Sequence, residues 1–283
     1  MMEDAFILLS RNGVNRHQIT ECLTSLHENY NKQFNNKIVI FHEEGFDDDI
    51  DFINRLNVPN ILYYKVILQE PAEFLNESYD VKWPRAEQSK YSSLKYSNMC
   101  SFFAHEVFQH CINLGIKTYC RLDTDSIITG KINYNIFDDL NRRDLIYGYV
   151  IEQREFQHVV IELNRFVGDY VKEHNIKPRF YHKLLDQFGY YNYRCFYNNF
   201  ELLNIEKFYT QEVKQFLDAI KQSKNIYHYR WGDAPIRTFL ICLFFEEDRI
   251  KKYVDIDYTH LPFQHKNGNC NMTFNFPGIL GRL

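Results

Sequence analysis

Thr118-Tyr119-Cys120-Arg121-Leu122-Asp123-Thr124-Asp125 is the stretch of sequence that decides the fold. Its first five residues predict a short buried strand of a parallel sheet, and this strand ends at two carboxylates that are one residue apart. In sheets of this kind, ligands bind at the carboxyl ends of the strands. Carboxylate oxygens are ligands that Mn²⁺ and Mg²⁺ prefer, so Asp123 and Asp125 could hold a cation that bridges diphosphate oxygens. The alternative is an exposed acidic turn.

The segments around this stretch alternate between short apolar runs and runs with helical spacing. Strands are predicted at Phe6–Leu9, Lys37–Phe41, Ile61–Leu68 and Leu145–Ile151, and helices at Ile19–Tyr30, Val107–Leu114 and Ile236–Phe245. Between residues 151 and 218 we expect mainly helix, broken at 189–199, and we expect loops in the final stretch. The alternation predicts an α/β fold in one domain over residues 1–283, with a mainly parallel sheet and helices on both faces.

Charge and composition argue against nucleic acid and membranes as partners. The net charge is -4 and the pI is near 6.3, which offers no basic surface for nucleic acid or anionic lipid. Seven cysteines without a close-spaced pair predict neither a zinc motif nor a complete disulfide framework, and they favour a reducing compartment. The first apolar run, Ala5–Leu9, lacks the length and basic flank of a signal peptide. No run approaches the ~20 apolar residues of a membrane span. We therefore expect a soluble, cytoplasmic protein.

The segment Tyr229–Pro235 places Arg230, Trp231 and Asp233 directly before a predicted apolar helix. Asp233 could cap that helix, since Pro235 follows it closely, or it could bind a ligand. Trp231 beside Arg230 has the chemistry to stack on a sugar ring and bind its hydroxyls. The aromatic content of 17% suits a sugar site, although core packing explains such an excess equally well.

Two further residues have a chemistry that the sequence alone leaves open. Glu201 ends the aromatic run Tyr197–Glu201. It is either a surface or helix-start charge, or a carboxylate placed beneath an anomeric carbon. His260 follows two acidic residues and is either a structural imidazole or a ligand for Mn²⁺.

Several motifs occur in an order that identifies a family. Taken together, the chain resembles the fungal α-1,2-mannosyltransferase family of the Kre2/Mnt1 type, from the first strand to about His260. The matching stretches are Phe6–Asn12, Tyr96–Cys100, Tyr119–Asp125, Cys195–Glu201, Tyr229–Pro235 and Asp255–His260. The string Arg-Trp-Gly-Asp-Ala-Pro and the string Asn-Phe-Glu are the most specific of these matches.

The resemblance implies a GT-A fold, GDP-mannose as the donor, Mn²⁺ (or Mg²⁺) as the cofactor, and transfer with retention to a mannoside hydroxyl. It implies a nucleotide-sugar-binding half at residues 1–130 and an acceptor-binding half at 131–283. By position it assigns the metal to Asp123, Asp125 and His260; catalysis to Glu201, Asp233 and Tyr96; the nucleotide to Arg11, Arg121, Asp123 and Tyr96; and the acceptor to Trp231, Arg230 and Arg237. Glu201 matches the carboxylate proposed as nucleophile or as stabiliser of an oxocarbenium-like transition state.

The chain also departs from the family pattern. It has Asp123-Thr124-Asp125 where the family has Glu-Pro-Asp, and Arg237 where the family commonly has His. The membrane anchor, stem and luminal cysteine pattern of the family are absent from the sequence, which suggests an unusual setting such as a large virus. Two rival hypotheses stay open: the same fold with another nucleotide-sugar donor, or a catalytically silent homologue that binds sugar or nucleotide.

Overall fold

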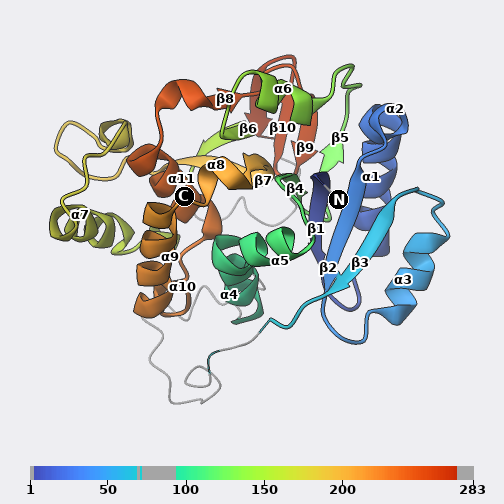
Figure 1. Cartoon of the computed structure of the whole chain (residues 1–283), viewed down its shortest axis with the longest axis horizontal. Helices are drawn as coiled ribbons and strands as arrows, with labels where there is room; N and C mark the ends of the chain where they lie inside the picture. The colour runs from blue at the N-terminus through green and yellow to red at the C-terminus, as the bar shows by residue number, and fades with distance from the viewer. Residues whose placement is uncertain (1–2, 69–70, 72–93, 273–283) are drawn as a thin grey trace, which may run out of the picture.

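The computed structural model describes residues 3–68, 71 and 94–272 (Figure 1). Strand β4 (Thr118–Leu122) lies in the middle of a seven-stranded sheet with the order β3-β2-β1-β4-β7-β6-β8. In this sheet β7 is antiparallel to both of its neighbours, whereas the other pairs are parallel. The other strands of the sheet are β1 (Asp4–Ser10), β2 (Lys37–His42), β3 (Ile61–Lys65), β6 (Tyr147–Arg154), β7 (Arg194–Asn204) and β8 (Ile250–Lys252).

Helices cover both faces of the sheet. Successive side chains of a strand point to opposite faces, so each face has its own apolar core, which helices bury. Phe6 and Cys120 belong to the core on one face, and Ile7 and Tyr119 belong to the core on the other. Figure 1 shows α1 and α5 on opposite sides of β1 and β2. The first face is covered by α1 (Arg16–Leu26), α3 (Asp47–Asn54) and α6 (Ile136–Arg142), and the second by α4 (Leu94–Ser101), α5 (Val107–Asn113), α7 (Leu163–Glu173), α9 (Gln211–Ser223) and α11 (Asp233–Phe244).

Short helical segments connect these elements. The π-helical turn η5 joins α4 to α5 without a break, so Leu94–Asn113 is continuously helical. The short segments are η1 (His27–Asn31), α2 (Lys32–Phe34), η5 (Phe102–Glu106), η6 (Gln157–Val159), η7 (Tyr181–Leu184), α8 (Ile205–Phe208), α10 (Asn225–His228) and η8 (Glu247–Arg249). Among the described residues, the search for a helix long and apolar enough to cross a membrane found none.

A second, four-stranded sheet lies at the carboxyl end of β4. It has the order β11-β10-β9-β5, with β5 (Ile127–Ile128), β9 (Tyr258–His260), β10 (Phe263–Lys266) and β11 (Asn269–Met272). Strand β5 pairs antiparallel with β9, with Ile127 opposite Thr259. Since β5 begins two residues after Asp125, this register brings His260 next to the acidic pair.

The predicted α/β class is confirmed, and the strand at Thr118–Leu122 is correct at both ends. Two predictions were wrong. The chain between 151 and 218 is not mainly helical, because Arg194–Asn204 forms the 11-residue strand β7. The final stretch is not all loop, because it contributes strands to both sheets. Strand β7 is buried over most of its length, so it lacks the alternation of polar and apolar residues that marks a half-exposed strand.

Candidate active site

A cluster of two carboxylates and one imidazole lies where β4 meets the second sheet. One ligand atom each from Asp123, Asp125 and His260 lies within 4.8 Å of the others. His260 Nε2 is 3.1 Å from Asp125 Oδ1 and 3.7 Å from Asp123 Oδ2. The two acids come from the end of β4 and the histidine from the end of β9, so residues far apart in sequence converge on one point.

The loop that carries the acidic pair is fixed by hydrogen bonds to both sheets. The Asp123 backbone N–H donates to Ser126 Oγ (3.1 Å), and the Ser126 N–H donates to the Asp123 carbonyl (3.0 Å). The hydroxyls of Ser126 and Tyr258 lie 2.7 Å apart, and Tyr258 donates to the carbonyl of Asn199 (2.9 Å). The turn after β4 is therefore held by β9 and by β7, which fixes the direction of its carboxylates.

The environment of His260 is suited to a cation. Burial alone would lower the pKa of His260, but its contact with Asp125 and the charge of Asp123 raise the pKa above its ordinary value. On the other side of the ring, Nδ1 lies 3.2 Å from the hydroxyl of Tyr197. Two carboxylate groups and one imidazole are a donor set for Mn²⁺ or Mg²⁺, and a phenol on the second ring nitrogen is the kind of outer partner that orients a histidine ligand. The residues present therefore fit a divalent cation.

Arg121 connects this cluster to the start of α11. Its Nε lies 3.0 Å from Asp123 Oδ1, and its Nη1 contacts Asp233. Asp233 also accepts a hydrogen bond from Asn198 Nδ2 (2.8 Å). Burial alone would lower the pKa of Arg121 and raise that of Asp233, but the charges of Asp123 and Asp233 raise the former well above its usual range, and Arg121 lowers the latter. Both groups are therefore charged. The guanidinium lies over the ring of Phe103, 3.4 Å from its centroid.

Glu201 lies in the middle of β7 and is only 1% exposed. Its Oε1 accepts a hydrogen bond from the Tyr119 hydroxyl, and its Oε2 lies 3.0 Å from Nε of Arg237. Of the two interpretations that the sequence left open for Glu201, the structure rules out a surface or helix-start charge, because the carboxylate is buried within a strand. Burial alone would lower the pKa of Arg237, but Glu201 raises it above its usual range.

Tyr96, Arg230 and Arg11 are three further predicted site residues. Tyr96, on α4, is covered by the guanidinium of Arg230, which lies 4.5 Å from the ring centroid. Burial, with smaller contributions from Cys100 and Asp233, raises the pKa of Tyr96 well above its ordinary value. Arg11 follows β1 and bonds to the carbonyl of Lys95 on α4 (2.5 Å), so it lies at the carboxyl edge of the sheet.

Trp231 and Arg237 lie in the interior. Trp231 is 0% exposed and its indole N–H donates to the carbonyl of Ile161 (2.6 Å). Arg237 is 1% exposed and donates from Nη2 to the carbonyl of Phe103 (2.8 Å). The acceptor role predicted for these two residues stays a prediction, and their burial does not favour it.

Sequence reasoning missed the partners that hold the site together. Tyr197 and Asn198 lie in a motif that the sequence singled out, but nothing local shows that one reaches His260 and the other Asp233. Ser126 and Tyr258 are further contacts of this kind. Their roles depend on the pairing of β5 with β9 and of β4 with β7, which no short motif encodes.

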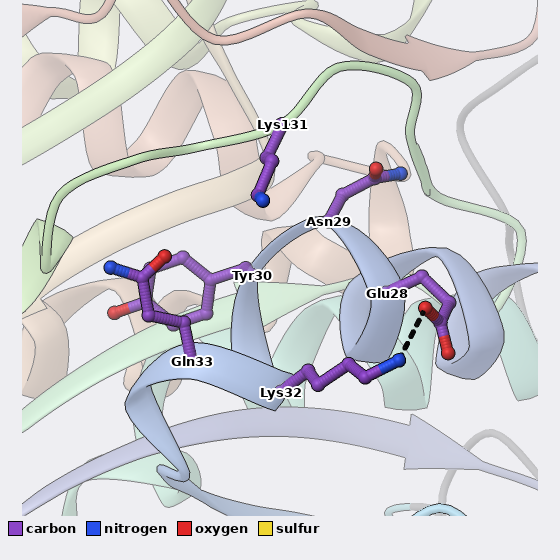
Figure 2. Close-up of a pocket in the computed structure, with 6 residues that line it drawn as sticks. All are labelled: Glu28, Asn29, Tyr30, Lys32, Gln33 and Lys131. Atoms are coloured by element: carbon purple, nitrogen blue, oxygen red, sulfur yellow. Dashed lines mark hydrogen bonds and ion pairs between the residues drawn. The ribbon is translucent and has the colours of Figure 1, made fainter.

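A separate pocket lies away from these residues. Figure 2 shows it between the η1–α2 segment and Lys131. Its volume is about 130 Å³. Lys32 in this pocket pairs with Glu28 at 3.2 Å. The pocket contains none of the predicted site residues and is not part of the cluster described above; it is lined by Glu28, Asn29, Tyr30, Lys32, Gln33 and Lys131.

The mainly parallel sheet, with two carboxylates and one imidazole clustered at the carboxyl end of a central strand, has the architecture of the GT-A fold. The chain belongs to the glycolipid 2-alpha-mannosyltransferase family, whose model matches residues 2–273. The X-ray structure of the mannosyltransferase Ktr4p from S. cerevisiae in complex with GDP is similar to this chain, with a TM-score of 0.84 and 25% identity over 93% of this chain and 72% of that one. The core-mannan synthase A of Aspergillus fumigatus, in its Mn/GDP form, shares the fold with a TM-score of 0.80 and 20% identity over 94% of this chain and 76% of that one.

Proteins that are similar in sequence are also named mannosyltransferases. The probable mannosyltransferase KTR4 of Saccharomyces cerevisiae is 26% identical over 89% of this chain. The probable mannosyltransferase MNT3 of Candida albicans is 29% identical over 60% of this chain. This chain spans 61% of the length of the first relative and 45% of the second. The predicted family and GT-A fold are confirmed, whereas the predicted cytoplasmic location stays a prediction.

Proposed function

We propose that this protein is a divalent-cation-dependent glycosyltransferase that moves mannose from GDP-mannose to a mannoside hydroxyl, with retention and in an α-1,2 linkage. The observation that carries the proposal is the convergence of Asp123, Asp125 and His260 at the carboxyl end of β4. The relatives that share this fold are named mannosyltransferases, and Ktr4p was crystallised with GDP. These names support mannose as the sugar and guanosine as the nucleoside.

In this proposal Asp123, Asp125 and His260 hold Mn²⁺ or Mg²⁺. When bound, the cation neutralises the negative charge that develops on the leaving nucleoside diphosphate. The protein supplies the fixed ligands: the hydrogen bonds of Ser126 keep the acidic turn in place, and Tyr197 orients the imidazole. Preorganised groups of this kind lower the barrier because they need not rearrange as charge develops.

In this proposal residues 1–130 supply the nucleotide side. Residues 131–283 supply the acceptor side, and they also contribute the metal ligand His260. Arg11, at the end of β1, is positioned for the nucleotide side because the carboxyl edge of such a sheet is where nucleotides bind. Arg121 acts indirectly in this proposal: it is buried, and its guanidinium holds the carboxylates of Asp123 and Asp233 in place. Tyr96, Asp233 and Arg230 lie near one another and are proposed to face the transferred sugar and the acceptor hydroxyl.

The test is the release of GDP from GDP-mannose in the presence of Mn²⁺ and a methyl α-mannoside, beside UDP-sugars and an EDTA control. We expect release that the acceptor stimulates and EDTA abolishes. An Asp125→Asn variant should lose this activity, whereas Asp169→Asn, at an exposed position on α7, should keep it. Turnover with another donor would overturn mannose while keeping the reaction class. No turnover with any donor, in a folded protein that binds GDP, would favour the silent homologue.

A further inference from the structure

Four buried charges lie where α11 crosses the central strands. Arg121 on β4 and Glu201 on β7 are cross-strand partners, so their side chains share one face of the sheet. Asp233 and Arg237 on α11 are four residues apart and therefore lie on one face of that helix. Arg121 pairs with Asp233, and Glu201 pairs with Arg237. We call these four residues the charge square.

The signs of the charge square alternate around its perimeter. Its members are 1% to 5% exposed, so solvent screens their charges only weakly. On α11, Asp233 is negative and Arg237 is positive. On the strands opposite, Arg121 is positive and Glu201 is negative. The square is neutral as a whole, and loss of Glu201 or Arg237 would leave the other residue of that pair buried without its charged partner.

Arg237 fixes more than the position of one oxygen atom. Besides Glu201 Oε2, it bonds to the carbonyl of Phe103 in η5, and its guanidinium lies 4.7 Å and 5.0 Å from the ring centroids of Phe108 and Phe208. It thereby connects β7, α11 and the long helix that begins with α4 and carries Tyr96. Movement of the Glu201 carboxylate would disturb each of these contacts.

Both oxygens of Glu201 are engaged, one by the Tyr119 hydroxyl and one by Arg237. A nucleophilic carboxylate must bring one oxygen to within about 3–3.5 Å of the reacting carbon, which this arrangement opposes. We propose that Arg237 is a positioning residue that holds Glu201 in the charge square, and that Glu201 acts on the transfer reaction by its charge, without forming a bond to the sugar. This inference rests on the proposed transferase function.

The test is a double-mutant cycle with Glu201→Gln, Arg237→Met and the two together, read by kcat, KM for GDP-mannose and Tm. Each single variant should lower both kcat and Tm, because it leaves one buried charge unpaired. The double variant removes both charges of the pair and should regain Tm, as coupled neighbours do. Its kcat should stay as low as that of Glu201→Gln, because the charge of Glu201 is missing from both variants. Arg237→Lys should keep more kcat than Arg237→Met, because it keeps the positive charge.

The matched control is Arg194→Met, which breaks the partly exposed ion pair of Arg194 with Glu152 (2.7 Å) on neighbouring strands. It should leave kcat within about threefold, since exposed pairs contribute little. A double variant that regains both Tm and kcat would overturn the proposal, as would a hexose found covalently on Glu201 by mass spectrometry after incubation with donor alone. A wild-type protein without transferase activity would refute the proposed function and the catalytic part of the inference. Recovery of Tm in the double variant would still establish the positioning of Glu201 by Arg237.

Discussion

The hydroxyl of Tyr197 should control the affinity of the proposed cation site. It lies 3.2 Å from Nδ1 of His260, while Nε2 faces Asp125 and Asp123. Burial first, then the charge of Asp123, raises the pKa of Tyr197, so the phenol stays protonated. If Nε2 binds a cation, the ring proton is on Nδ1, and this N–H donates a hydrogen bond to the phenol oxygen. The hydrogen bond fixes the orientation of the ring. Tyr197→Phe removes this partner and leaves the three ligands in place.

The size of the effect follows from this contact. Loss of an outer partner of a histidine ligand commonly weakens metal binding ten- to a hundredfold. The 3.2 Å separation is at the long end for a hydrogen bond, so we expect the lower end of that range, about tenfold or about 1.4 kcal/mol. Electron paramagnetic resonance of free Mn²⁺ during titration measures the affinity directly and does not require turnover.

The control is Tyr63→Phe, on the edge strand β3. It removes a hydroxyl that donates a hydrogen bond to Asn54 Oδ1 (3.0 Å). It should leave the Mn²⁺ affinity unchanged, and His260→Ala should weaken it more than Tyr197→Phe does. An affinity for Tyr197→Phe within twofold of the wild-type value would refute the role of this contact. Equal affinities in wild type and His260→Ala would refute the cation site itself.

Three further variants test other parts of the structure. Asp233→Ala removes a partner of the buried Arg121 and should lower the free energy of unfolding by about 3 kcal/mol; an unchanged urea midpoint would contradict this. Trp231→Phe leaves the Ile161 carbonyl without its donor and should cost about 2 kcal/mol, whereas a raised acceptor KM at unchanged Tm would instead support the acceptor role. Burial raises the pKa of Asp4 to about 6, so the stability that its protonated form contributes below pH ~4 is lost as the pH rises to about 6. Asp4→Asn should therefore be more stable than wild type by about 1 kcal/mol at pH 7, a value reduced for partial exposure. It should give no gain in stability at pH 4. Equal gains at both pH values would show that ionisation of Asp4 is not the cause.

The sequence predicted the parallel half of the sheet well because that half is built from local signals. Each of its strands is a short apolar run, and the run at Thr118–Leu122 ends at an acidic pair that cannot continue into the core. Strand β7 gave no such signal. Its polar residues Asn198 and Glu201 are buried in mid-strand, where they are stabilised by Asp233 and Arg237 on a helix more than thirty residues later in the chain. A pattern read over a short window cannot register partners at that distance.

The same limit explains which site residues were predicted with the correct surroundings. Asp123 and Asp125 were found from their position after a strand, and the structure places them beside His260 because β5 pairs with β9. Arg237 and Trp231 were assigned to the acceptor by the resemblance to the family, from their positions in and just after the motif that contains Asp233. Trp231 precedes α11 and turns toward Ile161 in the core, whereas Asp233 and Arg237 share one face of the helix and pair with Arg121 and Glu201. Adjacency in a motif therefore identifies the family, whereas the chemistry of each side chain depends on the strand or helix that lies opposite it.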